Sequence, residues 1–118
     1  MQRRLAGLFA APARLIFAAA LLTGPALAQS PPKSAIEQGR KILEANCARC
    51  HAIGLLGDSP LNIAPPFRTL HQRYPVETLA EALSEGIVTG HTEMPAFVFG
   101  DEEIGAIIAY LKALEVKR

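Results

Sequence analysis

Apolar side chains recur at steps of three and four residues in three segments of the chain, which is the spacing of a helix with one buried face. The first segment runs from residue 34 to residue 46. Ser34 and Glu37 have the spacing of a capping box, so the pattern predicts that this helix starts at Ser34. Its apolar stripe consists of Ile36, Gly39, Ile42, Leu43 and Asn46.

The second segment begins at Pro75, because proline is tolerated in the first turn of a helix. Glycine commonly ends a helix, so we expect this one to end near Gly86 or Gly90. Its apolar stripe consists of Val76, Leu79, Ala80, Leu83 and Ile87. A row of glutamates at i, i+4 and i+8 predicts a solvated face, with the docking of a partner as the alternative. The row is Glu77, Glu81 and Glu85.

The third segment starts at Asp101, which we expect to cap the last helix, and its last turns carry basic residues. The expected buried face is Ile104, Ile107, Ile108, Leu111 and Leu114, with Tyr110 beside it. Residues 51–70 and 89–100 are rich in glycine and proline and are expected to be long loops. No strand pattern of useful length appears, so the predicted fold class is all-α with three main helices.

The first 28 residues differ from the rest of the chain. They contain three arginines and no acid, an apolar stretch at 15–22, and the small-residue ending Ala26-Leu27-Ala28. This is the pattern of a secretory signal peptide, cleaved after Ala28, which predicts a soluble periplasmic protein. An uncleaved membrane anchor is the alternative, although the apolar stretch is shorter than the roughly 20 residues that span a bilayer. The remainder would be a proline-rich flexible leader at 29–33 and one domain at 34–118.

Composition excludes several classes of protein. The chain has 118 residues, 12 basic and 11 acidic side chains and a net charge of +1, which does not predict a nucleic-acid-binding surface. Without the three arginines of the signal peptide, acidic side chains outnumber basic ones. Two cysteines form one disulfide at most, so the chain is not a disulfide-rich scaffold.

Both cysteines lie in the motif Cys47-Ala48-Arg49-Cys50-His51. Two thiols at this spacing followed by a histidine are typical of the attachment site of a c-type haem, in which the thiols bond the porphyrin and His51 binds the iron. A thioredoxin-like redox pair would need a βαβ setting, which the pattern does not supply. A zinc site would need His71 and His91 beside the cysteines, without the paired spacings of structural zinc modules.

A haem iron that only transfers electrons needs a second axial ligand. Removal of Met1 with the signal peptide would leave Met94 as the remaining methionine, in the loop before the last helix and followed by Pro95. A thioether opposite an imidazole suits electron transfer, so Met94 is the expected ligand, with His91 and His71 as competitors. The other N–H of an iron-bound histidine needs an acceptor, and we expect the carbonyl of Pro65 to provide it.

These residues together resemble the class I monohaem cytochromes c, the small bacterial type that is exported, over residues 34–115. The helix glycine of that family is matched by Gly39, eight residues before Cys47, and its C-terminal helix with an aromatic residue is matched by residues 107–111. Pro65-Pro66-Phe67 and Met94-Pro95 resemble its two loop motifs. The family often has an aromatic residue where this chain has Leu43.

The resemblance implies the cytochrome c fold, with three main helices and long loops around one haem c attached through Cys47 and Cys50. It implies an electron carrier rather than an enzyme, which exchanges electrons with periplasmic or membrane-bound redox proteins. Two alternatives are a haem subunit fixed to a larger oxidoreductase, and a protein in which Met94 dissociates so that the iron binds a small ligand.

Overall fold

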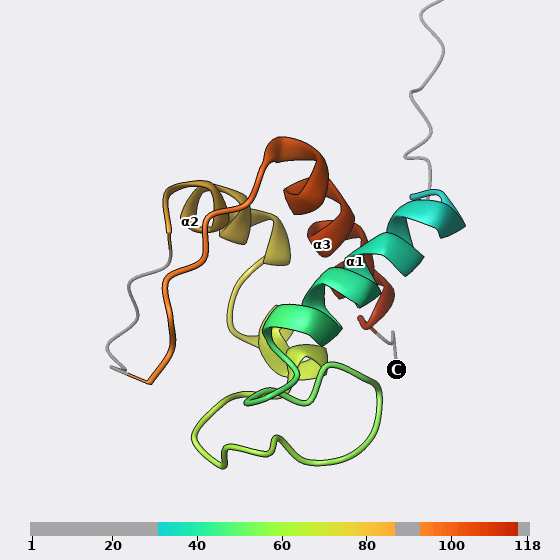
Figure 1. The fold of residues 1–118 in the computed structure, drawn as a ribbon. Helices are drawn as coiled ribbons and strands as arrows, with labels where there is room; N and C mark the ends of the chain where they lie inside the picture. Colours follow the sequence, from blue (N-terminus) through green and yellow to red (C-terminus); the bar gives the residue numbers. More distant parts are fainter. Residues whose placement is uncertain (1–30, 87–92, 116–118) are drawn as a thin grey trace, which may run out of the picture.

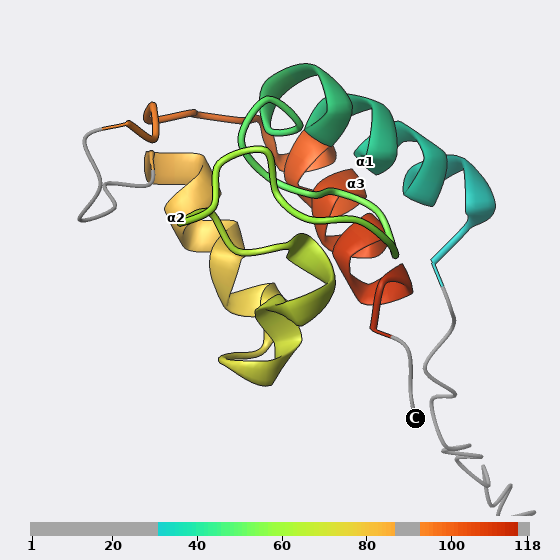
Figure 2. The ribbon, with the colours of Figure 1, turned by 90° about the horizontal axis from the view of Figure 1, so that it is seen from below.

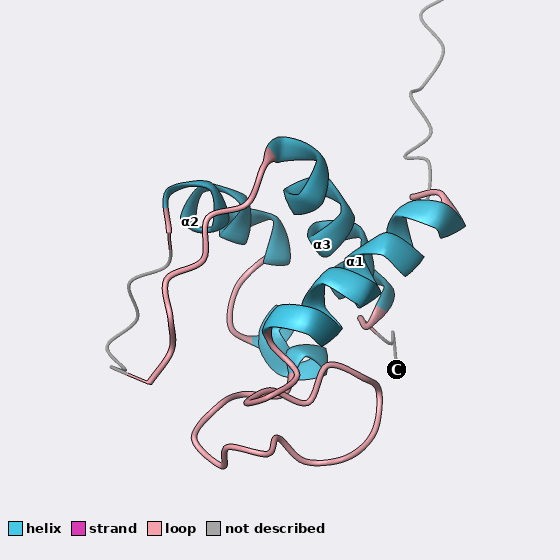
Figure 3. Cartoon of the chain, in the orientation of Figure 1, coloured by secondary structure: helices cyan, strands magenta, loops and turns pink. Residues whose placement is uncertain are grey.

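The computed structural model describes residues 31–86 and 93–115, and every regular element in these ranges is helical (Figures 1 and 3). Three α-helices are joined by loops that contain two short 3₁₀ helices. The elements in chain order are α1 (Lys33–Asn46), η1 (Phe67–Gln72), η2 (Val76–Thr78), α2 (Leu79–Glu85) and α3 (Asp101–Ala113). The expected all-α class with three main helices is therefore confirmed.

Helices α1 and α3 cross, and their backbones are in contact at Gly39. A Cβ atom built on Gly39 would lie 2.0 Å from the carbonyl oxygen of Ala106 and 2.9 Å from Cβ of Tyr110. Only a residue without a side chain allows the two backbones to approach this closely. The aromatic residue Tyr110 of α3 therefore packs directly on the helix glycine, and Figure 2 shows α1 beside α3.

The core lies between these two helices, η1 and α2, and the sequence pattern identified most of it. Residue Leu43, which stands where the family often has an aromatic side chain, is 3% exposed. The buried cluster is Leu43, Leu70, Val76, Leu83, Ile104, Ile107, Tyr110, Leu111 and Leu114. The hydroxyl of Tyr110 also donates a hydrogen bond of 3.1 Å to the carbonyl of Ile53, so α3 is tied to the loop that follows the CxxCH motif.

The predicted start of the first helix is wrong by one residue, and the capping box does not form. Helix α1 begins at Lys33, and the N-cap position belongs to Pro32, with no hydrogen bond from a side chain at the cap. The carbonyl of Pro32 accepts from the amides of Ala35 and Ile36 at 3.0 and 3.3 Å. Ser34 is already inside the first turn, where its hydroxyl cannot act as the cap.

The predicted cap of the last helix is also wrong. Gly100 holds the N-cap position, and its amide donates a hydrogen bond of 3.0 Å to the Glu103 carboxylate. Asp101 is the first residue of α3, where its negative charge favours the positive end of the helix dipole.

The second helix has the expected end. Helix α2 stops at Glu85 because Gly86 adopts a φ of 96°, a conformation that other residues rarely adopt. Its first turns are tighter than predicted, since Pro75 caps the 3₁₀ turn η2 rather than an α-helix. The three glutamates of the acidic row are exposed, and Glu77 forms an ion pair with Lys112 of α3.

The loop predicted at 51–70 contains an element that the sequence pattern did not reveal. Its last residues form η1, in which Thr69 donates through both its amide and its hydroxyl to the carbonyl of Pro66, at 3.0 and 2.8 Å. The predicted signal peptide and the candidate ligand His91 lie outside the described residues. Among the helices that are described, none is both long and apolar enough to cross a membrane.

Candidate cofactor site

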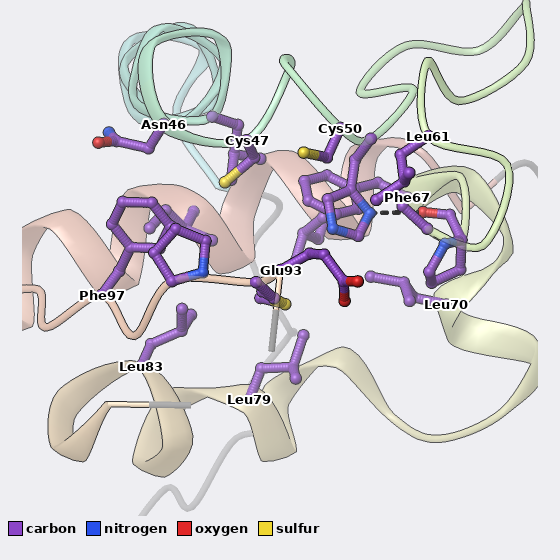
Figure 4. A pocket seen from close by; sticks show the side chains of 18 of the residues that line it. Asn46, Cys47, Cys50, Leu61, Phe67, Leu70, Leu79, Leu83, Glu93 and Phe97 are labelled. Atoms are coloured by element: carbon purple, nitrogen blue, oxygen red, sulfur yellow. Dashed lines mark hydrogen bonds between the residues drawn. The ribbon is translucent and has the colours of Figure 1, made fainter. Parts of the chain in front are cut away.

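The CxxCH motif forms a tight turn at the end of α1. The amide of Cys47 donates to the carbonyl of Leu43 at 2.8 Å, which completes the helix. The amides of Cys50 and His51 then both donate to the carbonyl of Cys47, at 3.1 and 2.9 Å. This turn brings the sulfur atoms of the two cysteines and the ring of His51 to the same pocket, as Figure 4 shows for the cysteines.

The loop after the motif folds back and is hydrogen-bonded to it. Leu61 donates its amide to the carbonyl of Cys50 at 3.1 Å, and Phe67 donates its amide to the carbonyl of Ala52 at 2.9 Å. The amide of Ala52 donates to the hydroxyl of the buried Ser59 at 3.0 Å. The backbone around His51 is therefore fixed by contacts from 7 to 15 residues later in the chain.

His51 is oriented by two contacts. Its Nδ1 lies 2.8 Å from the carbonyl oxygen of Pro65 (dashed line in Figure 4), and its ring centroid lies 4.7 Å from that of Phe67. A carbonyl oxygen only accepts hydrogen bonds, so Nδ1 carries the proton. In the neutral ring, Nε2 then has a free lone pair, which is the form of imidazole that binds a metal.

The two cysteines, His51, Pro65 and Met94 all line one central pocket, a cavity of about 290 Å³ between the helices. Most of its wall is apolar. The apolar residues include Leu43, Leu61, Ile63, Leu70, Leu79, Leu83, Phe97, Phe99, Ile107 and Leu111. The structure thus brings together every site residue that the sequence predicted.

Met94 reaches this pocket from the segment that precedes α3. That segment is held against α2 by a hydrogen bond of 3.0 Å from the amide of Phe99 to the carbonyl of Leu83. The rings of Phe97 and Phe99 stack with centroids 5.9 Å apart and an angle of 20° between their planes. Both rings line the pocket beside Met94, so the thioether lies in an apolar wall.

Four polar residues of the pocket wall were not predicted as site residues: Asn46, Arg73, Tyr74 and Glu93. Two of these could have been found from the sequence, because Asn46 precedes Cys47 and Glu93 precedes Met94. Arg73 and Tyr74 reach the pocket only because η1 turns the chain back, and no local pattern predicts that turn.

The first thiol of the motif does not have the lowered pKa of a redox-active cysteine. Both cysteines are free, and burial, together with the nearby Cys50, raises the pKa of the Cys47 thiol to about 11. At neutral pH this thiol is protonated, whereas disulfide-exchange enzymes depend on a cysteine with a lowered pKa.

Of the residues named for a zinc site, His71 does not lie with the two cysteines, and His91 lies outside the described residues. In residues 31–86 and 93–115, no group of three or more His, Cys, Asp or Glu side chains could hold a metal ion. His71 lines a separate hollow, with Leu55, Leu56, Arg68 and other residues, and not the central pocket. Because His71 does not line the pocket that contains His51, it is not placed to bind the same iron.

The donors in the central pocket fit a haem. Two thiols lie at the end of α1, an imidazole presents a free Nε2, and a thioether lies in the same apolar cavity. A porphyrin needs a largely apolar cavity of this kind, thiols for its two vinyl groups, and nitrogen or sulfur ligands for its iron.

Comparison with known families agrees with this chemistry. The family model described as cytochrome C oxidase, cbb3-type, subunit III, matches residues 34–111. No curated protein and no solved structure matches the chain. The chain belongs to this family, and its domain is a c-type cytochrome that carries a haem c on Cys47 and Cys50 and transfers electrons.

Proposed function

We propose that the protein is a one-electron carrier whose haem iron is held by His51 and Met94. The observation that supports this most directly is that His51 and Met94 line one largely apolar pocket. The Nδ1 of His51 donates a hydrogen bond to the carbonyl of Pro65, which leaves Nε2 free for the iron. A haem held by both residues would leave no free position on its iron for a substrate. The bound haem supplies one-electron chemistry, the change between ferric and ferrous iron.

The residues around the haem have separable roles in this proposal. Pro65 and Phe67 hold the imidazole of His51, and the hydrogen bond to Pro65 makes Nε2 a better donor to the iron. Apart from His51, Arg73 is the basic residue of the pocket wall, and its guanidinium, together with the hydroxyl of Tyr74, suits the carboxylate groups of a haem. The leucines and phenylalanines of the wall exclude water.

Electrons would pass at the haem edge that is bonded to the two cysteines, because the motif lies in a surface turn where Arg49 is exposed. Contacts between electron-transfer proteins are small and short-lived. We therefore propose transient contacts with a membrane complex, a dehydrogenase or a terminal acceptor. The predicted cleavage after Ala28 would place these contacts in the periplasm.

The test is a redox titration, with visible spectra, of the holoprotein produced together with a cytochrome c maturation system. The wild type should give the alkaline pyridine spectrum of a covalent haem and a thioether-to-iron charge-transfer band. Met94→Ala should keep the covalent haem but lose this band and lower the reduction potential, because a thioether ligand raises it. Val98→Ala is the matched control, since Val98 is 70% exposed and lies outside the pocket wall.

An unchanged potential and band in Met94→Ala would contradict the assignment of this ligand. Binding of carbon monoxide by the reduced protein separates the proposal from a small-ligand-binding function. A stable thioether should make this binding slow in the wild type and fast in Met94→Ala. Fast binding in both proteins would indicate that Met94 is not a stable ligand.

A fixed haem subunit of a larger oxidoreductase is the second candidate function, and the name of the family, an oxidase subunit, favours it. Membrane extraction of the native protein distinguishes the two: a shuttle is recovered free in the soluble fraction, whereas a subunit co-purifies with its complex.

A further inference from the structure

One carboxylate lines the central pocket, and the roles given above do not use it. Glu93 directly precedes Met94, and in Figure 4 its side chain extends into the pocket toward Leu70. Among the described residues it is the one acidic side chain of the pocket wall, and the only Lys or Arg side chain that lines the wall with it is Arg73. The wall around it is otherwise apolar or neutral.

No described group neutralises this charge. The ion pairs within residues 31–86 and 93–115 join Arg40 to Glu37 and Glu44, and Lys112 to Glu77. Glu93 takes part in none of them, and no described side chain donates a hydrogen bond to it. If Arg73 pairs with the carboxylates of the haem, its charge is compensated there, and the carboxylate of Glu93 remains uncompensated in the pocket.

We infer that Glu93 lowers the reduction potential of the haem and so sets which redox partners can reduce this protein. The inference rests on the proposed function, in which Met94 binds the iron. Ferric haem carries one more positive charge than ferrous haem, so a nearby carboxylate stabilises the oxidised form more than the reduced form. Glu93 is consecutive with the proposed ligand Met94 and lines the same pocket, so we expect its charge to act on the iron in both oxidation states.

The size of the effect depends on the surroundings of the carboxylate. Glu93 is exposed to water at the mouth of the pocket, so water and salt screen its charge in part. The apolar wall behind it screens less than water does. Together these conditions predict a moderate effect that decreases as the ionic strength increases.

The experiment compares the holoproteins of wild type, Glu93→Gln and Glu93→Asp in the same titration. Glutamine has the size of glutamate without its charge. At an ambient potential equal to the wild-type midpoint, the ratio of reduced to oxidised protein should rise about three- to tenfold in Glu93→Gln. Glu93→Asp should stay close to the wild type, because the charge is kept.

Glu102→Gln is the control for the general loss of one negative charge. Glu102 is exposed in the first turn of α3 and does not line the pocket. The ratio of reduced to oxidised protein in Glu102→Gln should stay within about 1.5-fold of the wild-type ratio. Raising the salt concentration should reduce the effect of Glu93→Gln and leave Glu102→Gln unchanged.

An unchanged or lower ratio in Glu93→Gln would overturn the inference, as would an equal shift in Glu102→Gln. Loss of the thioether-to-iron band in Glu93→Gln would also overturn it, since the residue would then act on the shape of the Met94 segment. A wild type without this band would instead contradict the proposed ligand, so the two failures are distinguishable.

Discussion

At the scale of single residues, the contact of α1 with α3 depends on the missing side chain of Gly39. Gly39→Ala would place a Cβ 2.0 Å from the carbonyl oxygen of Ala106, and a backbone atom cannot move aside without separating the helices. We expect the free energy of unfolding of the holoprotein to fall by about 3 kcal/mol or more. Denaturation in guanidinium chloride, followed by circular dichroism, measures it.

Gly105→Ala is the matched control, because a Cβ at this exposed position of α3 meets nothing within 4 Å. It should stabilise the protein by about 0.5–1 kcal/mol, since alanine favours a helix over glycine. Equal effects of the two substitutions would show that the crossing is not close.

At the scale of elements, the loop at 51–66 has no regular structure and is held by a few hydrogen bonds, one of them to Ser59. Ser59→Ala removes the acceptor of the buried Ala52 amide, next to His51. We expect a loss of about 1–3 kcal/mol of stability, because an unpaired buried amide is unfavourable. Ser84→Ala is the control, because the Ser84 hydroxyl is exposed on α2 and its loss should change stability by less than about 0.5 kcal/mol.

The same denaturation experiment measures both serine variants. If Ser59→Ala matches Ser84→Ala, the loop is held in place by its other contacts, those of Cys50, Ala52 and Tyr110. Broadening of the Ala52 amide resonance in Ser59→Ala would place the loss at this hydrogen bond.

The helices could be predicted from the sequence, but their first residues could not. The apolar stripes of α1 and α3 extend over at least three turns, so the period is clear in the sequence. Each cap depends on only one or two hydrogen bonds, and the N-cap residues are Pro32 and Gly100 rather than Ser34 and Asp101. The 3₁₀ helix η1 lacks a period altogether, because it is only six residues long and is set by what it packs against.

At the scale of the whole molecule, the sequence predicted the residues of the site more completely than the details of the fold, because the chemistry of the site is concentrated in one short motif. Cys47, Cys50 and His51 lie within five consecutive residues, and the requirements of a haem iron indicated Met94 and Pro65, which line the same pocket. Arg73 and Glu93 enter the pocket from segments far apart in the chain. Which polar residues complete the wall depends on how those segments pack, and the sequence pattern does not contain that information.

The haem is also a structural part of this small domain. Five of the nine residues in the buried cluster line the central pocket as well, so more than half of the core faces the cavity that the haem fits. These five are Leu43, Leu70, Leu83, Ile107 and Leu111. Without a haem, these side chains lose the apolar surface opposite them, and a domain of this size has little other core.

We therefore expect the chain produced without a cytochrome c maturation system to be largely unfolded. Its far-ultraviolet circular dichroism should show much less helix than the holoprotein, and its amide resonances should lose their dispersion. Met94→Ala is the control, because it removes the proposed iron ligand but keeps the covalent haem and should keep the helices. A haem-free chain with the helix content and dispersed spectrum of the holoprotein would show that the four remaining core residues, Val76, Ile104, Tyr110 and Leu114, are enough to hold α1 against α3.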